Sequence, residues 1–342
     1  MKAIKTFFVR YRLWILALCA VLLVLFPLVI RNKLVLTVGC YILLYSIVSM
    51  SNMIIIGYGG MLNLGQAAFY GIGAYTTALL SLHFQLPFFM CFFLSGLVAA
   101  LLGFLISVPC LRVRADFLGL ITLAFLQLFI SITQNWVSLT RGPMGLTNIP
   151  SASLFGFQFN TQTRFFYLAL VIAVLSYVIL KRLMASPAGR AIQSIRDDEI
   201  GARSVGIDVN YYKILVFTVG AFFAGITGCL YVSYVGYVGS ATFTLETSFL
   251  LMEMNIVGGL GSLGGAVFGA AFFTIMPELI RTLAAYRVGI GGLLMLLVVL
   301  FRPQGVFGSR AFAGNGGILA GKLKKRKRVS STPAQLGEED EP

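Results

Sequence analysis

The sequence contains no lysine, arginine, aspartate or glutamate between Leu34 and Leu111. A soluble domain needs charged side chains over much of its surface, and a stretch of this length cannot supply them. An α-helix needs about 20 apolar residues in a row to cross the hydrocarbon core of a membrane. The whole chain has the same character, since 58% of its 342 residues are hydrophobic and 11% are charged. We therefore predict an all-α, polytopic membrane protein folded as a helix bundle.

The apolar runs predict about ten membrane spans. We interpret the run 13–30 as a retained first span, because basic residues follow it where a signal peptide would have a small-residue cleavage site. The chain then divides into a segment 1–33 that contains this span, a helix bundle at 34–301, and a disordered tail at 302–342 that is first basic and then acidic. The predicted spans are 13–30, 34–56, 61–82, 86–110, 117–136, 165–183, 214–236, 248–262, 264–280 and 283–301.

The distribution of positive charge predicts the orientation. An even number of spans puts both termini on one side of the membrane. If that side is the cytoplasm, 20 of the 26 Lys and Arg residues lie in cytoplasmic segments and 6 in external ones, as the positive-inside rule requires. We therefore attribute the net charge of +14 to membrane orientation and not to a nucleic-acid partner.

Two glycine-rich segments resemble each other. GGMLNLGQAAF (59–69) and GGLGSLGGAVF (258–268) agree at six of eleven positions without gaps, and Asn63 aligns with Ser262. Paired interruptions of apolar segments in two halves of a chain are typical of the central site of a transporter. Glycine permits a helix to break, and the free N–H groups of the following half-helix suit an anion such as a carboxylate.

We therefore predict two broken helices in a pseudo-repeat of two halves, with a substrate pathway between them. Close packing of helices through small residues is the alternative explanation for the glycines. The predicted pathway residues are Gly59, Gly60, Asn63, Gly65, Gln66, Gly258, Gly259, Gly261 and Ser262.

The polar loop 185–213 faces the cytoplasm in this topology. Ser186-Pro187 is a helix-start signal, and Gly206 is a helix stop. Helical spacing places Ile192, Ile195 and Ile200 on one face. A helix this short is marginal in water, so we expect it to dock on another surface; an ordinary solvated loop is the alternative.

The residues favour a transport protein over an enzyme. The five cysteines lie in apolar stretches without a C-x-x-C pair, and the chain has one histidine, His83, so we predict no metal site, no cofactor and no catalytic group. The segment 316–323 fits G-x-x-x-x-G-K, but Leu323 stands where a phosphate-binding loop has Ser or Thr. An ATPase would therefore have to be another chain. Glu253 could serve an ion-coupled secondary transporter instead.

Several motifs, in order over about residues 35–308, resemble the membrane subunit of branched-chain amino acid ABC importers, the LivM family. They are the first glycine segment, RGPMGLTNIP (141–150), SIRDDEIGARSVGIDVNYYKILVF (194–217), GGLGSLGGAVFGA (258–270) and LFRPQGVFG (300–308). Asn63 stands where the family usually has Ser, and Gln66 where it usually has His.

The resemblance implies half of a heterodimeric permease in a prokaryotic plasma membrane. Its partners would be a second, homologous permease subunit, two ABC ATPase subunits and an extracytoplasmic substrate-binding protein. The permease of a urea or short-amide importer is a similar alternative. The resemblance also implies that the cytoplasmic loop couples the ATPases to the bundle, through Arg196, Asp197, Asp198, Glu199 and Gly206.

Overall fold

The computed structural model describes residues 27, 32–110, 115–154, 157–279, 287–301 and 305–308. All of the predicted first span at 13–30 except residue 27, and most of the predicted tail at 302–342, lie outside these residues. The helices are α3 (Lys33–Met53), η1 (Ile54–Tyr58), α4 (Gln66–His83), α5 (Phe88–Cys110), α6 (Ala115–Asn135), α7 (Val137–Thr140), η2 (Gly142–Met144), α8 (Gln162–Ala185), α9 (Pro187–Asp197), α10 (Glu199–Ser204), α11 (Val209–Val235), η3 (Ser240–Thr242), α12 (Leu245–Gly258), α13 (Leu263–Leu279) and α14 (Arg287–Phe301).

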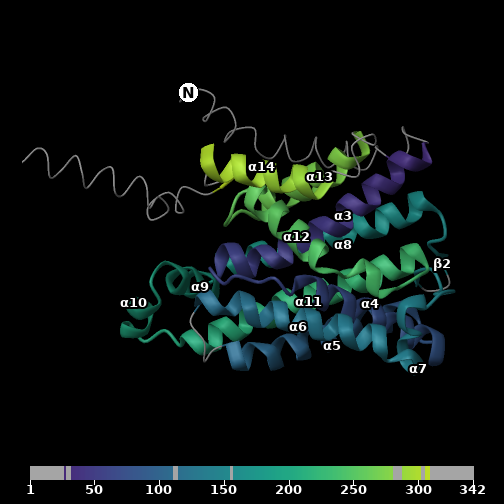
Figure 1. The fold of residues 1–342 in the computed structure, drawn as a ribbon, viewed down its shortest axis with the longest axis horizontal. Helices are drawn as coiled ribbons and strands as arrows, with labels where there is room; N and C mark the ends of the chain where they lie inside the picture. Colours follow the sequence, from purple (N-terminus) through teal and green to yellow (C-terminus); the bar gives the residue numbers. More distant parts are fainter. Residues whose placement is uncertain are drawn as a thin grey trace, which may run out of the picture.

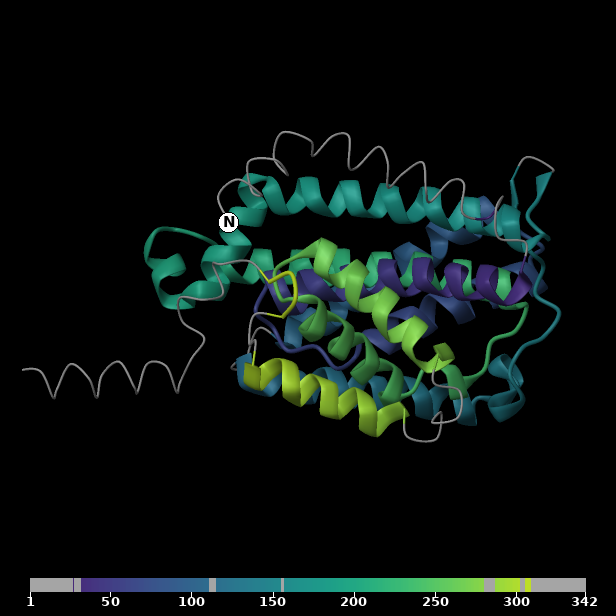
Figure 2. The ribbon, with the colours of Figure 1, turned by 90° about the horizontal axis from the view of Figure 1, so that it is seen from above.

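The prediction of an all-α helix bundle with membrane-spanning segments is confirmed by the helices that the structure describes. Five described segments are long and apolar enough to cross a membrane, namely Lys33–Tyr58, Phe88–Pro109, Phe117–Asn135, Gln162–Ala185 and Val209–Val235. A shorter apolar helix covers Leu263–Glu278. Figures 1 and 2 show most of the long helices lying lengthwise in the molecule.

Helix α11 lies at the centre of the bundle and packs against α5, α4 and α3 (Figure 1). It is the most enclosed of the five candidate spans, with 72% of its most apolar stretch buried by other parts of the chain. Glycines allow this close approach. A Cβ added to Gly225 would lie 2.6 Å from the backbone oxygen of Ser95, and one added to Gly228 would collide with the Tyr70 carbonyl. Small residues therefore set the helix spacing here, as in other membrane bundles.

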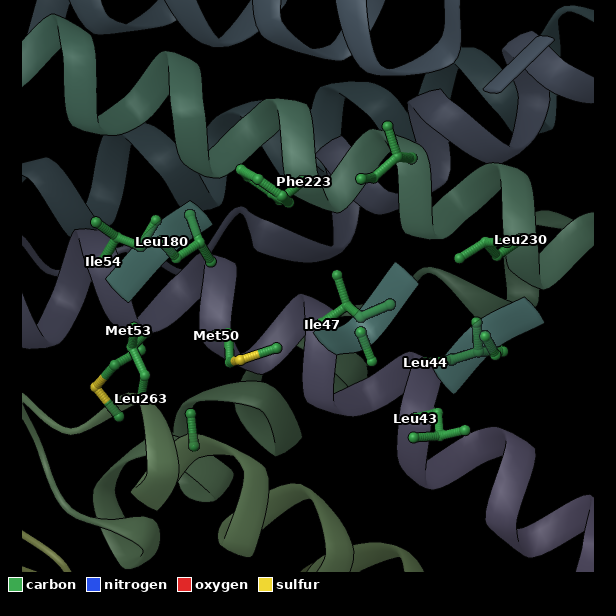
Figure 3. Close-up of a cluster of buried hydrophobic side chains, with 14 of the residues drawn as sticks. Leu43, Leu44, Ile47, Met50, Met53, Ile54, Leu180, Phe223, Leu230 and Leu263 are labelled. Carbon is green, nitrogen blue, oxygen red and sulfur yellow. The ribbon is translucent and has the colours of Figure 1, made fainter. Parts of the chain in front are cut away.

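A second packing centre surrounds α3. Figure 3 shows Leu44, Ile47 and Met50 of α3 among side chains of neighbouring helices, including Leu180 of α8 and Phe223 of α11. Apolar side chains lie around this helix on several sides, which explains why its hydrophobicity shows little helical periodicity.

The two ends of the bundle carry different connections. The short elements α9 and α10 lie at one end, and α7 and the hairpin of β1 (Ser153–Leu154) and β2 (Phe157–Gln158) lie at the other (Figures 1 and 2). The loop predicted to be cytoplasmic and the loop predicted to be external are therefore at opposite ends of the structure.

Candidate functional site

The first glycine segment, residues 59–65, joins η1 to α4. The last turn before it is π-helical, and the Gly59 amide donates to the Ile54 carbonyl at 2.8 Å. Gly60 has a φ of +67°, which favours glycine. Helix α4 then begins at Gln66, after the start of the predicted span 61–82. Single π-helical turns of this kind often occur at functional sites.

Two buried amides fold this segment back along α3. The Asn63 Nδ2 donates to the Asn52 Oδ1 at 3.2 Å and to the Gln66 Oε1 at 2.7 Å, while its Oδ1 accepts from the Gly65 amide at 3.0 Å. The Gln66 Nε2 donates to the Ser51 hydroxyl at 2.8 Å. Asn63 and Gln66 are both fully buried. The chain therefore reverses here, and these two side chains hold the reversal through bonds inside the protein.

The start of α4 is also occupied by neighbouring side chains. The Leu64 amide donates to the Thr122 hydroxyl at 3.0 Å, and the Ala67 amide donates to the Ser248 hydroxyl at 3.1 Å. The first N–H groups of a helix lack partners within the helix. In this structure, residues of α6 and α12 provide the acceptors.

The second glycine segment, residues 259–262, joins α12 to α13 in a tight hairpin. Gly259 and Gly261 have φ angles of +116° and +78°, so both adopt backbone conformations that favour glycine. A Cβ on Gly258 would collide with the Gly265 carbonyl of the facing helix. The Ser262 hydroxyl accepts from the Gly265 amide at 3.2 Å and caps α13.

Part of the predicted tail completes this hairpin. The Val306 amide donates to the Val257 carbonyl at 3.0 Å, and the Phe307 amide donates to the Gly258 carbonyl at 2.9 Å. The last carbonyls of a helix lack partners within it, so residues 305–308 supply donors to the end of α12. These four residues are thus part of the folded bundle, and the disorder predicted for the tail does not apply to them.

The second glycine segment meets the end of the helix that leads into the first segment. A Cβ added to Gly57, in η1, would lie 2.7 Å from the Gly261 amide nitrogen. Figure 3 shows Met53 of α3 next to Leu263, the first residue of α13. The turn at 259–262 therefore packs against η1, directly before the first glycine segment.

A second set of buried polar groups connects α3 to the hairpin. The Ser49 hydroxyl lies 2.9 Å from the Asn255 Oδ1 and 3.3 Å from the Ala266 carbonyl, and both can accept from it. The Nδ2 groups of Asn52 and Asn255 are buried without an acceptor among the described residues. A buried donor without a partner costs about 1–3 kcal/mol, so these two fully buried amides destabilise the junction.

The loop 185–213, predicted to be cytoplasmic, forms two short helices. The Ser186 hydroxyl accepts from the Gly189 amide at 3.3 Å and starts α9, as predicted. Gly206, with a φ of +84°, follows the end of α10. The prediction that Ile192, Ile195 and Ile200 share one face is wrong. The first two are buried, whereas Ile200 is 82% exposed.

Asp198 causes this difference. Its backbone is extended, and its Oδ1 accepts from the amides of Ile200 and Gly201, both at 3.0 Å. Asp198 is therefore the N-cap of a new helix, and the helical repeat of α9 does not continue into α10.

The charged residues of the loop divide into two groups. Arg196 reaches inward, because its side chain is 9% exposed and its Nη1 donates to the Gly57 carbonyl at 3.1 Å. Glu199 forms ion pairs near the loop itself. Its carboxylate accepts from the Lys213 Nζ at 2.8 Å and from the Arg203 Nη2 at 2.9 Å. Burial raises the pKa of Glu199, but the hydrogen bonds and charges of Lys213 and Arg203 outweigh it and hold the pKa below its ordinary value.

Sequence reasoning missed Ser49, Asn52, Ser248 and Asn255, which complete the buried polar junction. Asn52 and Asn255 are isolated amides within long apolar runs. Polar residues in such runs are costly and often functional, so this signal was present in the sequence.

A separate cavity of about 320 Å³ lies at the opposite end of the bundle, near the loop that follows α7. Its lining combines several hydroxyl groups with apolar side chains and contains none of the predicted pathway residues. The lining residues are Thr77, Ser81, Gln85, Leu86, Pro87, Phe88, Cys91, Pro150, Ser151, Ser153 and Ser233.

Comparison with known proteins assigns the chain to a family. The sequence model of the protein family described as the branched-chain amino acid transport system permease component matches residues 34–301. The high-affinity branched-chain amino acid transport system permease protein LivM of Salmonella typhimurium is 34% identical over 321 residues, which cover 87% of this chain and 75% of that protein. LivM of Escherichia coli has the same identity and coverage. LivH of Salmonella typhimurium is 24% identical over 304 residues, covering 77% of this chain and 91% of that protein. No solved structure matches the chain. The chain therefore belongs to the family of permease components of branched-chain amino acid transport systems.

Proposed function

We propose that this chain is a transmembrane permease subunit of an ATP-driven importer of branched-chain amino acids and forms half of the translocation pathway. The observation that carries the proposal is the family match over residues 34–301, which contain both glycine segments and the cytoplasmic loop. The names of the relatives LivM and LivH, both branched-chain amino acid transport permeases, support the substrate class.

The junction of the two glycine segments supports the placement of the pathway. The pathway residues are those of the segments themselves: Gly59, Gly60, Asn63, Gly65, Gln66, Gly258, Gly259, Gly261 and Ser262. Asn63 and Gln66 are fully buried, so their role is to shape the first segment. Gly60 and Leu62 are exposed, and Ser262 is partly exposed. A second permease subunit would cover this exposed side and complete the pathway.

The unpaired Nδ2 groups of Asn52 and Asn255 add a chemical reason. Both side chains are fully buried in this structure, so a substrate carboxylate would reach these amide donors only when the junction opens. A neutral amide binds a carboxylate without the strong attraction of a positive charge. Weak binding suits a translocation pathway, because the substrate must leave as readily as it enters.

The same proposal includes the membrane topology of the chain and its partner subunits. We place about ten spans in the full chain, related as two halves, with both termini in the cytoplasm of a prokaryote. The opposite positions of α9–α10 and the α7 loop support one cytoplasmic and one external end (Figure 1). Two ATPase subunits would bind the cytoplasmic loops of the permease pair, in this chain at α9 and α10, where Asp197 and Ile200 are exposed. An extracytoplasmic binding protein would deliver substrate at the other end.

The proposal is tested by reconstituting the chain with its co-purifying partners in liposomes. We expect uptake of labelled leucine that requires both ATP and the binding protein. Leucine uptake driven by a proton gradient without ATP would refute the ATP-driven mechanism and favour an ion-coupled transporter that uses Glu253. ATP-dependent uptake of urea or short amides, without leucine uptake, would retain the mechanism and refute the substrate class.

A further inference from the structure

Arg196, a residue of the predicted coupling set, donates a side-chain hydrogen bond to the helix that leads into the first glycine segment. It lies in the last turn of α9, and its Nη1 donates to the Gly57 carbonyl, 139 residues away in the sequence, at 3.1 Å. Gly57 belongs to η1, the end of the α3 rod. The last carbonyls of a helix lack partners within it and carry partial negative charge, so a guanidinium is a favourable group at this position.

The aliphatic part of Arg196 contacts the first glycine segment as well. A Cβ added to Gly60 would lie 2.5 Å from the Arg196 Cγ and 3.2 Å from its Cβ. Gly60 therefore needs to be glycine for two reasons, its φ of +67° and this contact. One side chain thus touches both the end of the helix and the turn that follows it.

Asp197 holds the guanidinium from the outer side. Its Oδ1 accepts from the Arg196 Nε at 2.9 Å and from the Arg196 Nη2 at 2.7 Å, which leaves the Nη1 for Gly57. Asp197 is 61% exposed, whereas Arg196 is 9% exposed. A rigid, planar group therefore connects the outer surface of α9 with the buried end of η1.

We propose that Arg196 is a positioning residue that transmits displacement of α9 to the first glycine segment, and that it does not itself bind the ATPase. The inference rests on the proposed function. It predicts that loss of Arg196 separates ATP hydrolysis from transport. The ATPase surface, at the exposed residues of α9 and α10, would remain intact.

The first experiment compares Arg196→Ala and Arg196→Lys with Arg190→Ala in the full reconstituted complex. Arg190 lies on the same helix, and its side chain donates to the nearby Ala185 carbonyl at 3.4 Å. Leucine uptake and ATP hydrolysis are measured on the same vesicles. We expect Arg196→Ala to lower the ratio of leucine imported to ATP hydrolysed about tenfold, as loss of a charged hydrogen bond predicts, with hydrolysis within about twofold of wild type. Arg196→Lys should be intermediate, because an ammonium cannot reproduce the planar set of bonds, and Arg190→Ala should keep the ratio.

A second measurement tests the contact without transport. Leu62 is 40% exposed on the same segment, so Leu62→Cys in the full chain reports the accessibility of the segment to a thiol reagent. The chain without this change supplies the background labelling of the native cysteines. We expect labelling to be several-fold faster with Arg196→Ala than with Arg190→Ala, and Gly60→Ala should have the same effect as Arg196→Ala.

Each outcome decides between the claims. Equal labelling rates would overturn the contact, and a proportional fall of uptake and hydrolysis would show that Arg196 serves ATPase docking instead. Faster labelling with an unchanged ratio would overturn the transmission role. If the wild-type complex shows no ATP-driven uptake, the proposed function has failed, and the transmission role fails with it. Faster labelling with Arg196→Ala in that complex would still support the contact between Arg196 and the segment.

Discussion

Replacing Asn63 tests whether buried amides hold the first glycine segment in place. Asn63→Ala removes three hydrogen bonds, to Asn52, to Gln66 and from the Gly65 amide. A hydrogen bond contributes about 0.5–1.5 kcal/mol in proteins, and bonds between membrane helices average about 0.6 kcal/mol. We therefore expect the free energy of unfolding to fall by about 2–4 kcal/mol. Reversible unfolding in mixed micelles, followed by circular dichroism, measures this difference.

Two further variants make this prediction specific. Asn63→Ser should fall between wild type and alanine, because a hydroxyl can still accept from the Gly65 amide but cannot replace both bonds of the Asn63 Nδ2. Asn160→Ala is the matched control, since Asn160 is exposed and its Nδ2 donates to the Gln158 Oε1 at 2.8 Å; its effect should stay within about 0.5 kcal/mol. A loss for Asn63→Ala no larger than that of the control would refute the structural role of the network.

Three further predictions concern packing, pH and substrate. Gly269→Ala should lower the free energy of unfolding by about 1–3 kcal/mol, because its Cβ would collide with a carbonyl of α12, whereas Gly264→Ala, with one side-chain oxygen at 3.9 Å, should be neutral; equal thermal shifts would contradict this packing. Glu199→Gln should cost less than about 1 kcal/mol at pH 7. Burial raises the pKa of Glu199, but Lys213 and Arg203 together lower it by more, so the pKa in the folded protein is below the ordinary value. The stabilisation is therefore present above the ordinary pKa and disappears as the pH falls through the folded value. A stability difference between wild type and Glu199→Gln that grows in acid would be inconsistent with this sign. Asn255→Ala should raise the KM for leucine about tenfold if its free Nδ2 binds the carboxylate, as one charged hydrogen bond predicts, and an unchanged KM would exclude that contact.

Local signals located the helix ends well. Ser186 and Pro187 specify the start of α9, because a hydroxyl N-cap and a proline in the first turn both satisfy the geometry of a helix N-terminus. The same reasoning failed at Ile200, because it treated 192–200 as one continuous helix. Asp198 can accept from two amides at once and start a new helix, and that choice depends on how the loop packs.

The functional junction was only partly visible in the sequence. The glycine pattern indicated two related interruptions, and Asn63 and Gln66 indicated polar groups among them. Their role as buried supports became visible only when Asn52 and Ser51 lay beside them. The sequence pattern around a polar residue is the same whether its side chain faces a pathway or another side chain, so the pattern cannot distinguish the two roles.

The sequence by itself determined that this chain is a membrane helix bundle, because apolar run length and charge placement are local properties that the bilayer selects directly. It also determined where glycine is required, since a positive φ excludes most other residues. Only the tertiary structure decided that the second glycine segment packs against η1, that Ser49 binds Asn255, 206 residues away, and that Arg196 reaches Gly57. These contacts join residues far apart in the chain, and they arise from helix packing, which no local period or spacing records.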